Sequence, residues 1–399
     1  MRKRELKKIF AGFLVASTVL AGCGAGGENA EKPEEKKQEQ PAQKEQKEVK
    51  VEDTDSAKQT AAFEEMKAEL EKAEENNKVD WNLVQKKYQD GLQKDVAEIS
   101  ADFDQAIQAS IEAGKSGEMD AVVAGELINK TTQSYFYQSQ KTLQKAASEA
   151  LGSGKKKDAE MAFAQVKHLA EKVFIPTAEK RDNYYELTGE NSVAENINSG
   201  LSAQEEALKA DKAEDFSVYM QVTDKSIYRT FYLATKSYGE KIEAAVKEGK
   251  DKAELSIMQA EGWGFLQAIK ESLGGGDEAA AAELNKLFTL NETDPSAIKG
   301  DNVNKLFNKA IIGKINGYYT QAPEALKAGE QAMAKVEAME GNMFLKALQM
   351  QMNEKLGEDK SEETLNEAEK FYTAVSDNKQ DEAKAHAKTV MGNISELAK

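Results

Sequence analysis

The sequence predicts an all-α protein, built from internally repeated helical hairpins that form a bundle or a short solenoid. Three observations lead to this prediction. Ala, Glu, Lys, Gln and Leu are abundant in the 399 residues, and all five are good helix formers. Proline, which breaks helices, occurs only 5 times. No stretch combines β-branched residues with the apolar–polar alternation of a half-buried strand.

The first 22 residues are organised like a bacterial signal peptide. A basic segment, residues 2–8, precedes an apolar run, residues 9–20, which is too short to span a bilayer. The run ends in Leu20-Ala21-Gly22-Cys23, which resembles the lipobox of bacterial lipoproteins. This resemblance implies cleavage before Cys23 and a diacylglyceryl group on its thiol. Because two acyl chains anchor stably, we expect a protein held on the extracytoplasmic face of the cell membrane.

Residues 23–60 are predicted to form a disordered, charged tether. The segment is rich in Glu, Lys and Gln, contains Pro33 and Pro41, and has Val49 and Val51 as its only branched aliphatic residues. Such a composition cannot bury enough apolar surface to offset the entropy lost on ordering. A coil of this length would span roughly 30–36 Å and hold the following domain away from the membrane.

The helical repeat domain is predicted over residues 61–399. Asp80 stands before a segment of helical periodicity, as an N-cap does. An apolar stripe from Leu92 to Ile111 predicts one helix of more than five turns, which the glycines of residues 114–117 end.

Two further boundaries are predicted along the chain. The loop-rich stretch of residues 186–200 is the candidate boundary between two closely packed bundles. A terminal hairpin is expected from residues 361–376 and 379–397.

Internal repeats are the most informative feature of the domain. Residues 129–137 match residues 224–232, a separation of 95 residues, and a weaker third copy begins near Asn308. Farther along, residues 261–266 parallel residues 340–345. Repetition of this kind indicates helical hairpins that bury their apolar faces on one another.

The repeated lysine–tyrosine helix supplies the candidate ligand-binding residues. Lys130 and Tyr137 are seven residues apart and therefore share a helical face. Lys225 and Tyr232 repeat this spacing, with Arg229 between them. Cations and phenols from two pseudo-symmetric helices would suit a small anion or a carboxylated ligand. The alternative is that the tyrosines belong to the core while the lysine stems reach solvent.

Two glutamates are candidate metal ligands. Glu261 and Glu340 each precede a glycine inside a strong helix pattern. Bundles build metal sites from inward-facing glutamates, so the two carboxylates could share an ion. Close packing of helices at the two glycines is the alternative.

A second candidate metal pair is His168 and Glu171, which share a helical face. With this H-x-x-E element the chain is similar to the imelysin-type proteins, a resemblance that implies iron or haem uptake. Val166 stands where that family has a glycine, two residues before the histidine.

Composition limits the functions that remain. The net charge is −16, and residues 1–22 carry +4, so the remainder carries −20. A surface this acidic argues against nucleic acid as a partner. Two histidines, and no cysteine beyond Cys23, remove the parts of most catalytic sites, so we expect no enzymatic activity.

The sequence therefore predicts a membrane-anchored extracytoplasmic lipoprotein whose helical domain binds a small molecule or a surface protein. Two alternatives stay open: an imelysin-like protein of iron or haem acquisition, and a structural or assembly spacer that binds nothing. No particular cofactor is predicted.

Overall fold

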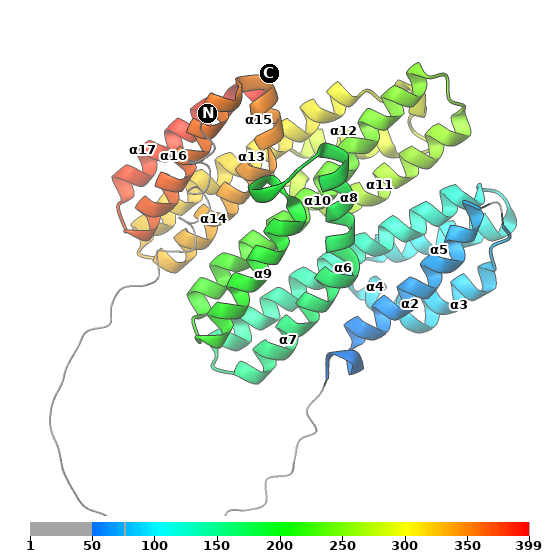
Figure 1. Cartoon of the computed structure of the whole chain (residues 1–399), viewed down its shortest axis with the longest axis horizontal. Coiled ribbons are helices and arrows are strands. Elements are labelled where there is room, and N and C mark those ends of the chain that lie inside the picture. The colour runs from blue at the N-terminus through cyan, green and yellow to red at the C-terminus, as the bar shows by residue number, and fades with distance from the viewer. Residues whose placement is uncertain (1–49, 76, 399) are drawn as a thin grey trace, which may run out of the picture.

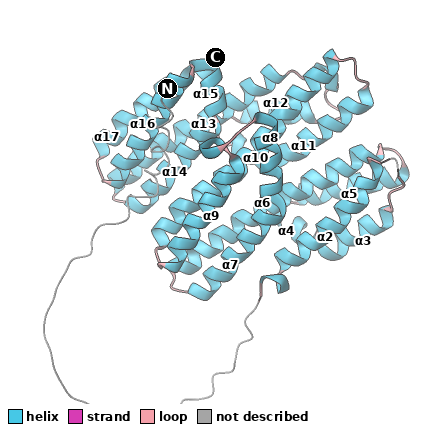
Figure 2. Ribbon diagram, viewed as in Figure 1, coloured by secondary structure: helices cyan, strands magenta, loops and turns pink. Residues whose placement is uncertain are grey.

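The computed structural model describes residues 50–398 except residue 76, and these residues form helices and loops without a strand (Figures 1 and 2). The predicted all-α class is therefore confirmed, whereas the lipobox lies outside the described residues. None of the described helices has the length and apolarity needed to cross a membrane.

The α-helices are α2 (Asp55–Leu70), α3 (Trp81–Gly91), α4 (Gln93–Ile99), α5 (Ala101–Ser116), α6 (Ala121–Gly152), α7 (Lys156–Leu169), α8 (Ile175–Tyr185), α9 (Val193–Lys209), α10 (Ala213–Lys247), α11 (Lys252–Gly274), α12 (Glu278–Phe288), α13 (Gly300–Ala328), α14 (Gln331–Ala347), α15 (Gln349–Leu356), α16 (Glu358–Ser376) and α17 (Gln380–Ile394).

Three long helices, α6, α10 and α13, organise the molecule. Each is followed by a shorter antiparallel partner: α7, α11 and α14. The hairpins interlock, because α11 also packs on α6 and α14 also packs on α10. In Figure 1 the N-terminal helices α2–α5 and the C-terminal helices α13–α17 lie at opposite sides of the molecule. The predicted repeats therefore form an interlocked, bundle-like arrangement.

The core is continuous across the predicted boundary at residues 186–200. One cluster of buried apolar side chains extends from Ala62 to Leu397. A loop does follow α8, but α9 already begins at Val193 and packs along α10. The loop therefore joins two elements of one core rather than two separate bundles.

The tether prediction was wrong at its C-terminal end. Residues 51–53 form a 3-10 turn, and Thr54 caps α2 by accepting a hydrogen bond from the backbone N–H of Ala57. Farther along α2, Thr60 Oγ1 lies 2.8 Å from Nε2 of His168 in α7. Polar side chains thus fix this end of the chain through hydrogen bonds, which a composition argument does not detect.

The stripe from Leu92 to Ile111 is interrupted, contrary to the single helix predicted. Ser100 has an extended backbone (φ −156°), and its hydroxyl caps α5 by accepting from the N–H of Phe103. Ile99, the last residue of α4, is 37% exposed. The apolar period therefore continues from α4 into α5, although the serine cap interrupts the helix between them. The end of α5 follows the prediction, with Gly117 at φ 77°.

Helix α7 continues into α8 through one turn of π-helix, Ala170–Phe174. Pro176 occupies the first turn of α8 and has no N–H to donate to the preceding turn. The wider turn accommodates this missing bond without ending the helix.

Candidate functional site

The first charged cluster in the interior is centred on Lys225 of α10. Its ammonium group contacts the carboxylate of Asp224 and lies 2.9 Å from Oε1 of Glu340 in α14. It also lies 5.2 Å from the ring centre of Phe344, one turn farther along α14. The Tyr318 hydroxyl of α13 donates to the same Glu340 oxygen at 2.5 Å. Three helices therefore meet at one buried lysine.

A second cluster repeats this arrangement around Lys130 of α6. Lys130 Nζ lies 2.7 Å from Oε2 of Glu126 and 3.7 Å from Oε1 of Glu261 in α11. The ring centre of Phe265 is 5.3 Å away, and the Tyr238 hydroxyl of α10 donates to Glu261 at 2.6 Å. The repeat seen in the sequence is thus a repeated set of buried ionic and aromatic contacts.

Glycine next to each glutamate permits this meeting of helices. A Cβ atom at Gly262 would lie 2.4 Å from Phe288, and one at Gly341 would lie 3.0 Å from Tyr319. Close helix packing, one of the two interpretations of the Glu-Gly pairs, is therefore confirmed. The two glutamates pair with different lysines, Glu261 with Lys130 and Glu340 with Lys225. Among the described residues no group of three or more His, Cys, Asp or Glu side chains could hold a metal ion.

The two clusters differ in their electrostatic balance. Burial alone would lower the pKa of Lys225, but Asp224 and Glu340 outweigh burial and raise it. Burial likewise works against the charged form of Asp224, yet Lys225 holds the pKa of that carboxyl below its usual range. In the other cluster burial prevails: it raises the pKa of Glu261, and Lys130 offsets only part of the increase.

A cleft of about 1290 Å³ opens beside the Lys225 cluster. Its lining comes from α2, α4 and α5 on one side, from α6 and α7, and from α10, α11 and α14 on the other side. Asp224, Lys225 and Glu340 all line it, whereas no residue of the Lys130 cluster does. One of two similar clusters is therefore accessible to a ligand through this cleft.

The lining of the cleft is strongly polar. It includes 7 carboxylates, 4 lysines and 6 glutamines. Tyr135 donates a hydrogen bond to Oε1 of Gln59, whose amide nitrogen donates to Asp95, so part of this lining is already ordered. The wholly apolar side chains among the 26 lining residues are Ile99, Phe103, Leu143 and Met220.

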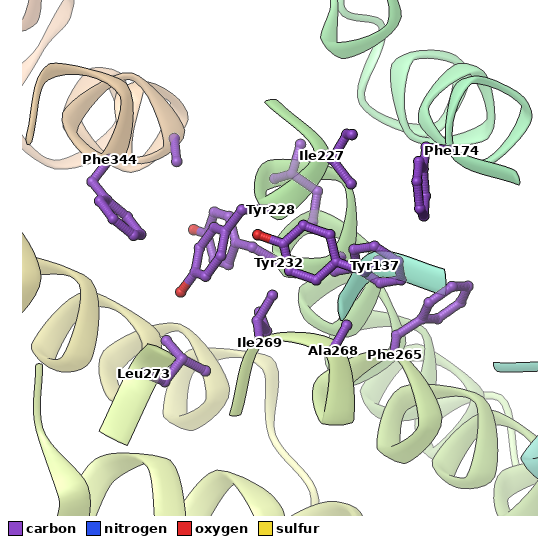
Figure 3. Packing of buried hydrophobic residues seen from close by; sticks show 14 of the residues in the cluster. Tyr137, Phe174, Ile227, Tyr228, Tyr232, Phe265, Ala268, Ile269, Leu273 and Phe344 are labelled. Carbon is purple, nitrogen blue, oxygen red and sulfur yellow. The ribbon is translucent and has the colours of Figure 1, made fainter. Parts of the chain in front are cut away.

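Of the five predicted ligand-binding residues, only Lys225 lines the cleft. Tyr137 and Tyr232 are 2% and 1% exposed and pack among apolar side chains, as Figure 3 shows, and the hydroxyl of Tyr137 also hydrogen-bonds to Asp224. Arg229 is buried as well and donates to the backbone carbonyl of Asn191 at 3.0 Å. Lys130 belongs to the cluster away from the cleft, so Lys225 alone lines it.

Sequence reasoning missed most of the cleft. It considered Glu340 only as a metal ligand, and it did not consider Asp224, although this acid directly precedes the repeated lysine. The glutamines of α2, α6, α7, α10 and α11 that line the cleft carry no signal in the sequence, because glutamine is common throughout the chain. Their convergence appears only when the helices are packed.

His168 and Glu171 line a separate, smaller cavity of about 410 Å³, next to Val51. Burial lowers the pKa of His168, and the nearby Lys172 lowers it further. Its Nε2 atom is already paired with the Thr60 hydroxyl. The pair is therefore in place, but the described structure adds no third ligand that would complete a metal site.

The described fold and cleft define an all-helical protein with a large polar cleft over a buried ion cluster. In comparisons with known proteins, no family model, no curated protein and no solved structure matches the chain. The similarity to imelysin-type proteins stays a prediction.

Proposed function

We propose that the protein is a lipid-anchored extracytoplasmic binding protein whose cleft takes up a polar small molecule. Support for the anchor comes from the basic segment, the apolar run and the lipobox-like Leu20-Ala21-Gly22-Cys23. Support for binding comes from the cleft, and the observation that carries the proposal is the contrast between the two clusters.

That contrast is informative because the clusters use the same side chains. A cluster that serves only to join three helices needs no large cleft beside it, and no residue of the Lys130 cluster lines this cleft. The Lys225 cluster instead lines a large cleft. A ligand in the cleft can therefore contact charged side chains whose orientation is already fixed by their ion pairs with one another. Convergent polar groups in a concave site are the usual mark of small-molecule binding. A spacer without a ligand would need no such opening.

A matched pair of substitutions tests the proposal. Lys225→Met and Lys130→Met each leave buried carboxylates without their cation, so both should cost about 3–5 kcal/mol of stability. Lys225→Met alone should also remove a co-purifying small molecule, detected by native mass spectrometry of the protein extracted from membranes. Because both variants lose the cation of a similar cluster and both are expected to be destabilised, a difference in ligand content reports on the cleft.

Three results decide the test. Loss of the bound molecule in Lys225→Met and its retention in Lys130→Met would support the proposal. Equal retention in both variants, or a wild-type protein that carries nothing, would contradict it. Stoichiometric iron or haem in the wild type would favour the acquisition alternative, and elemental analysis of the same sample detects this.

The anchor is tested separately. Replacement of Cys23 by serine removes the thiol to which the lipid would be attached. We expect the wild-type protein in the membrane fraction, with a mass increase on its N-terminal peptide, and the Cys23→Ser variant in the aqueous fraction. An unmodified Cys23 in wild-type protein would refute the lipoprotein assignment.

A further inference from the structure

We infer that the ligand of the cleft is a neutral oligosaccharide. This inference rests on the proposed binding function and adds the chemical class of the ligand. It follows from the lining residues, which favour one kind of hydrogen-bonding partner over the others.

The lining offers donors and acceptors in a mixed arrangement. Carboxylates only accept, lysines only donate, and glutamine amides do both. Carboxylates and glutamines line both sides of α6, with Asp95 and Gln59 on one side and Glu271 and Gln221 on the other, whereas the lysines come from α6, α10 and α11. A ligand that satisfies such a surface must donate and accept along its whole length. Hydroxyl groups do this, and an oligosaccharide carries several on every residue.

The charges of the lining disfavour strongly ionic ligands, and a polyanion most of all. Carboxylates outnumber lysines by 7 to 4 in the lining, which opposes a polyanion such as a nucleotide. The innermost lysine, Lys225, is already held between Asp224 and Glu340. A polycation would meet the same lysine together with Lys141 and Lys270 on the facing helices. An uncharged ligand avoids both conflicts.

An extended peptide lacks the features that would bind it here. Two common modes of peptide binding are addition to an exposed sheet edge and insertion of an apolar helix face into an apolar groove. The described residues contain no strand, and the backbone groups within the helices that form the cleft are already paired. Only four of the 26 lining side chains are wholly apolar, so no apolar groove is present.

The few apolar groups of the lining suit a sugar ring. Phe103 and Ile99 lie at the junction of α4 and α5, and both side chains keep some exposure. A pyranose ring has C–H faces that pack on such side chains while its hydroxyls point to polar neighbours. The cleft volume exceeds the roughly 300–1,000 Å³ of ordinary small-molecule pockets, which favours several linked rings over a monosaccharide.

Binding of three probe sets to the mature chain, residues 23–399, tests the inference. The first set holds neutral oligosaccharides of glucose, galactose, mannose and N-acetylglucosamine, in α and β linkages. The second holds spermidine and ATP, and the third holds uncharged tetrapeptides. We expect at least one oligosaccharide to bind in calorimetry. Gln221→Leu and Phe103→Ala, on opposite sides of the cleft, should each weaken it about tenfold.

Gln108→Leu is the control, because this exposed glutamine of α5 is absent from the lining. It should leave the affinity unchanged. Binding by spermidine, ATP or a tetrapeptide alone, reduced in the cleft variants, would overturn the sugar assignment while the proposed binding function survives. No binding from any set would overturn both, and so would oligosaccharide binding that Gln221→Leu and Phe103→Ala leave intact.

Discussion

The buried glutamates show how one side chain can have different effects in two copies of the same cluster. Glu340 lies 2.9 Å from its lysine, whereas Glu261 lies 3.7 Å from Lys130, which is closer to Glu126. Burial raises the pKa of Glu261 above its usual range. The folded protein therefore holds this proton more tightly than the unfolded chain does. Its free energy of unfolding falls as the pH rises from the unfolded pKa, about 4.3, through the folded pKa.

Glu261→Gln should remove this pH dependence. The amide keeps an oxygen that can accept from Tyr238 and carries no charge to bury. We expect the melting temperature of the variant, relative to wild type, to increase between pH 4 and pH 7. Glu340→Gln is the comparison, and it should lower stability at pH 7 because Lys225 loses a close partner. A wild-type-minus-variant difference that does not change with pH would contradict the raised pKa of Glu261.

Single elements depend on glycine where helices approach each other. A methyl group at Gly262 would lie 2.4 Å from the Phe288 ring, so Gly262→Ala should cost about 1–3 kcal/mol through overpacking. Gly317, inside α13, has no atom within 4 Å of the added carbon. Gly317→Ala should therefore stabilise the protein by up to about 1 kcal/mol, the difference in helix propensity. Chemical denaturation measures both changes, and destabilisation by the same amount at both positions would contradict this account.

At the level of elements, the sequence was reliable where one residue determines a boundary locally. Asp80 caps α3 by accepting from two backbone N–H groups, and Gly117 ends α5, both as predicted. The helix boundary at Ser100 was missed because the apolar residues of α4 and α5 keep one helical period across it, so the sequence pattern shows no interruption. The start of α2 was missed because it is held by partners about a hundred residues away, such as His168. Local patterns carry no record of such distant contacts.

The candidate site was predictable only in part, for a reason that belongs to the whole molecule. The repeated lysine was visible, and Lys225 does line the cleft. The tyrosines beside it share the repeat but serve the core, since a periodic aromatic residue is equally compatible with either role. The remaining lining comes from helices α2 to α14, so its composition depends on tertiary packing that no single segment specifies.

The same interlocking determines how the molecule should unfold. Helix α10 packs on α6, α9, α11, α13 and α14, and one core cluster extends from Ala62 to Leu397. Within the described residues, helices from both sides of the loop after α8 contribute side chains to this one cluster. We therefore expect a single calorimetric transition with equal van't Hoff and calorimetric enthalpies. Fragments cut at the loop after α8, residues 50–190 and 191–399, should expose apolar surface and fail to fold alone. Two resolved transitions, or a fragment with cooperative melting, would mean that the loop does separate independent units.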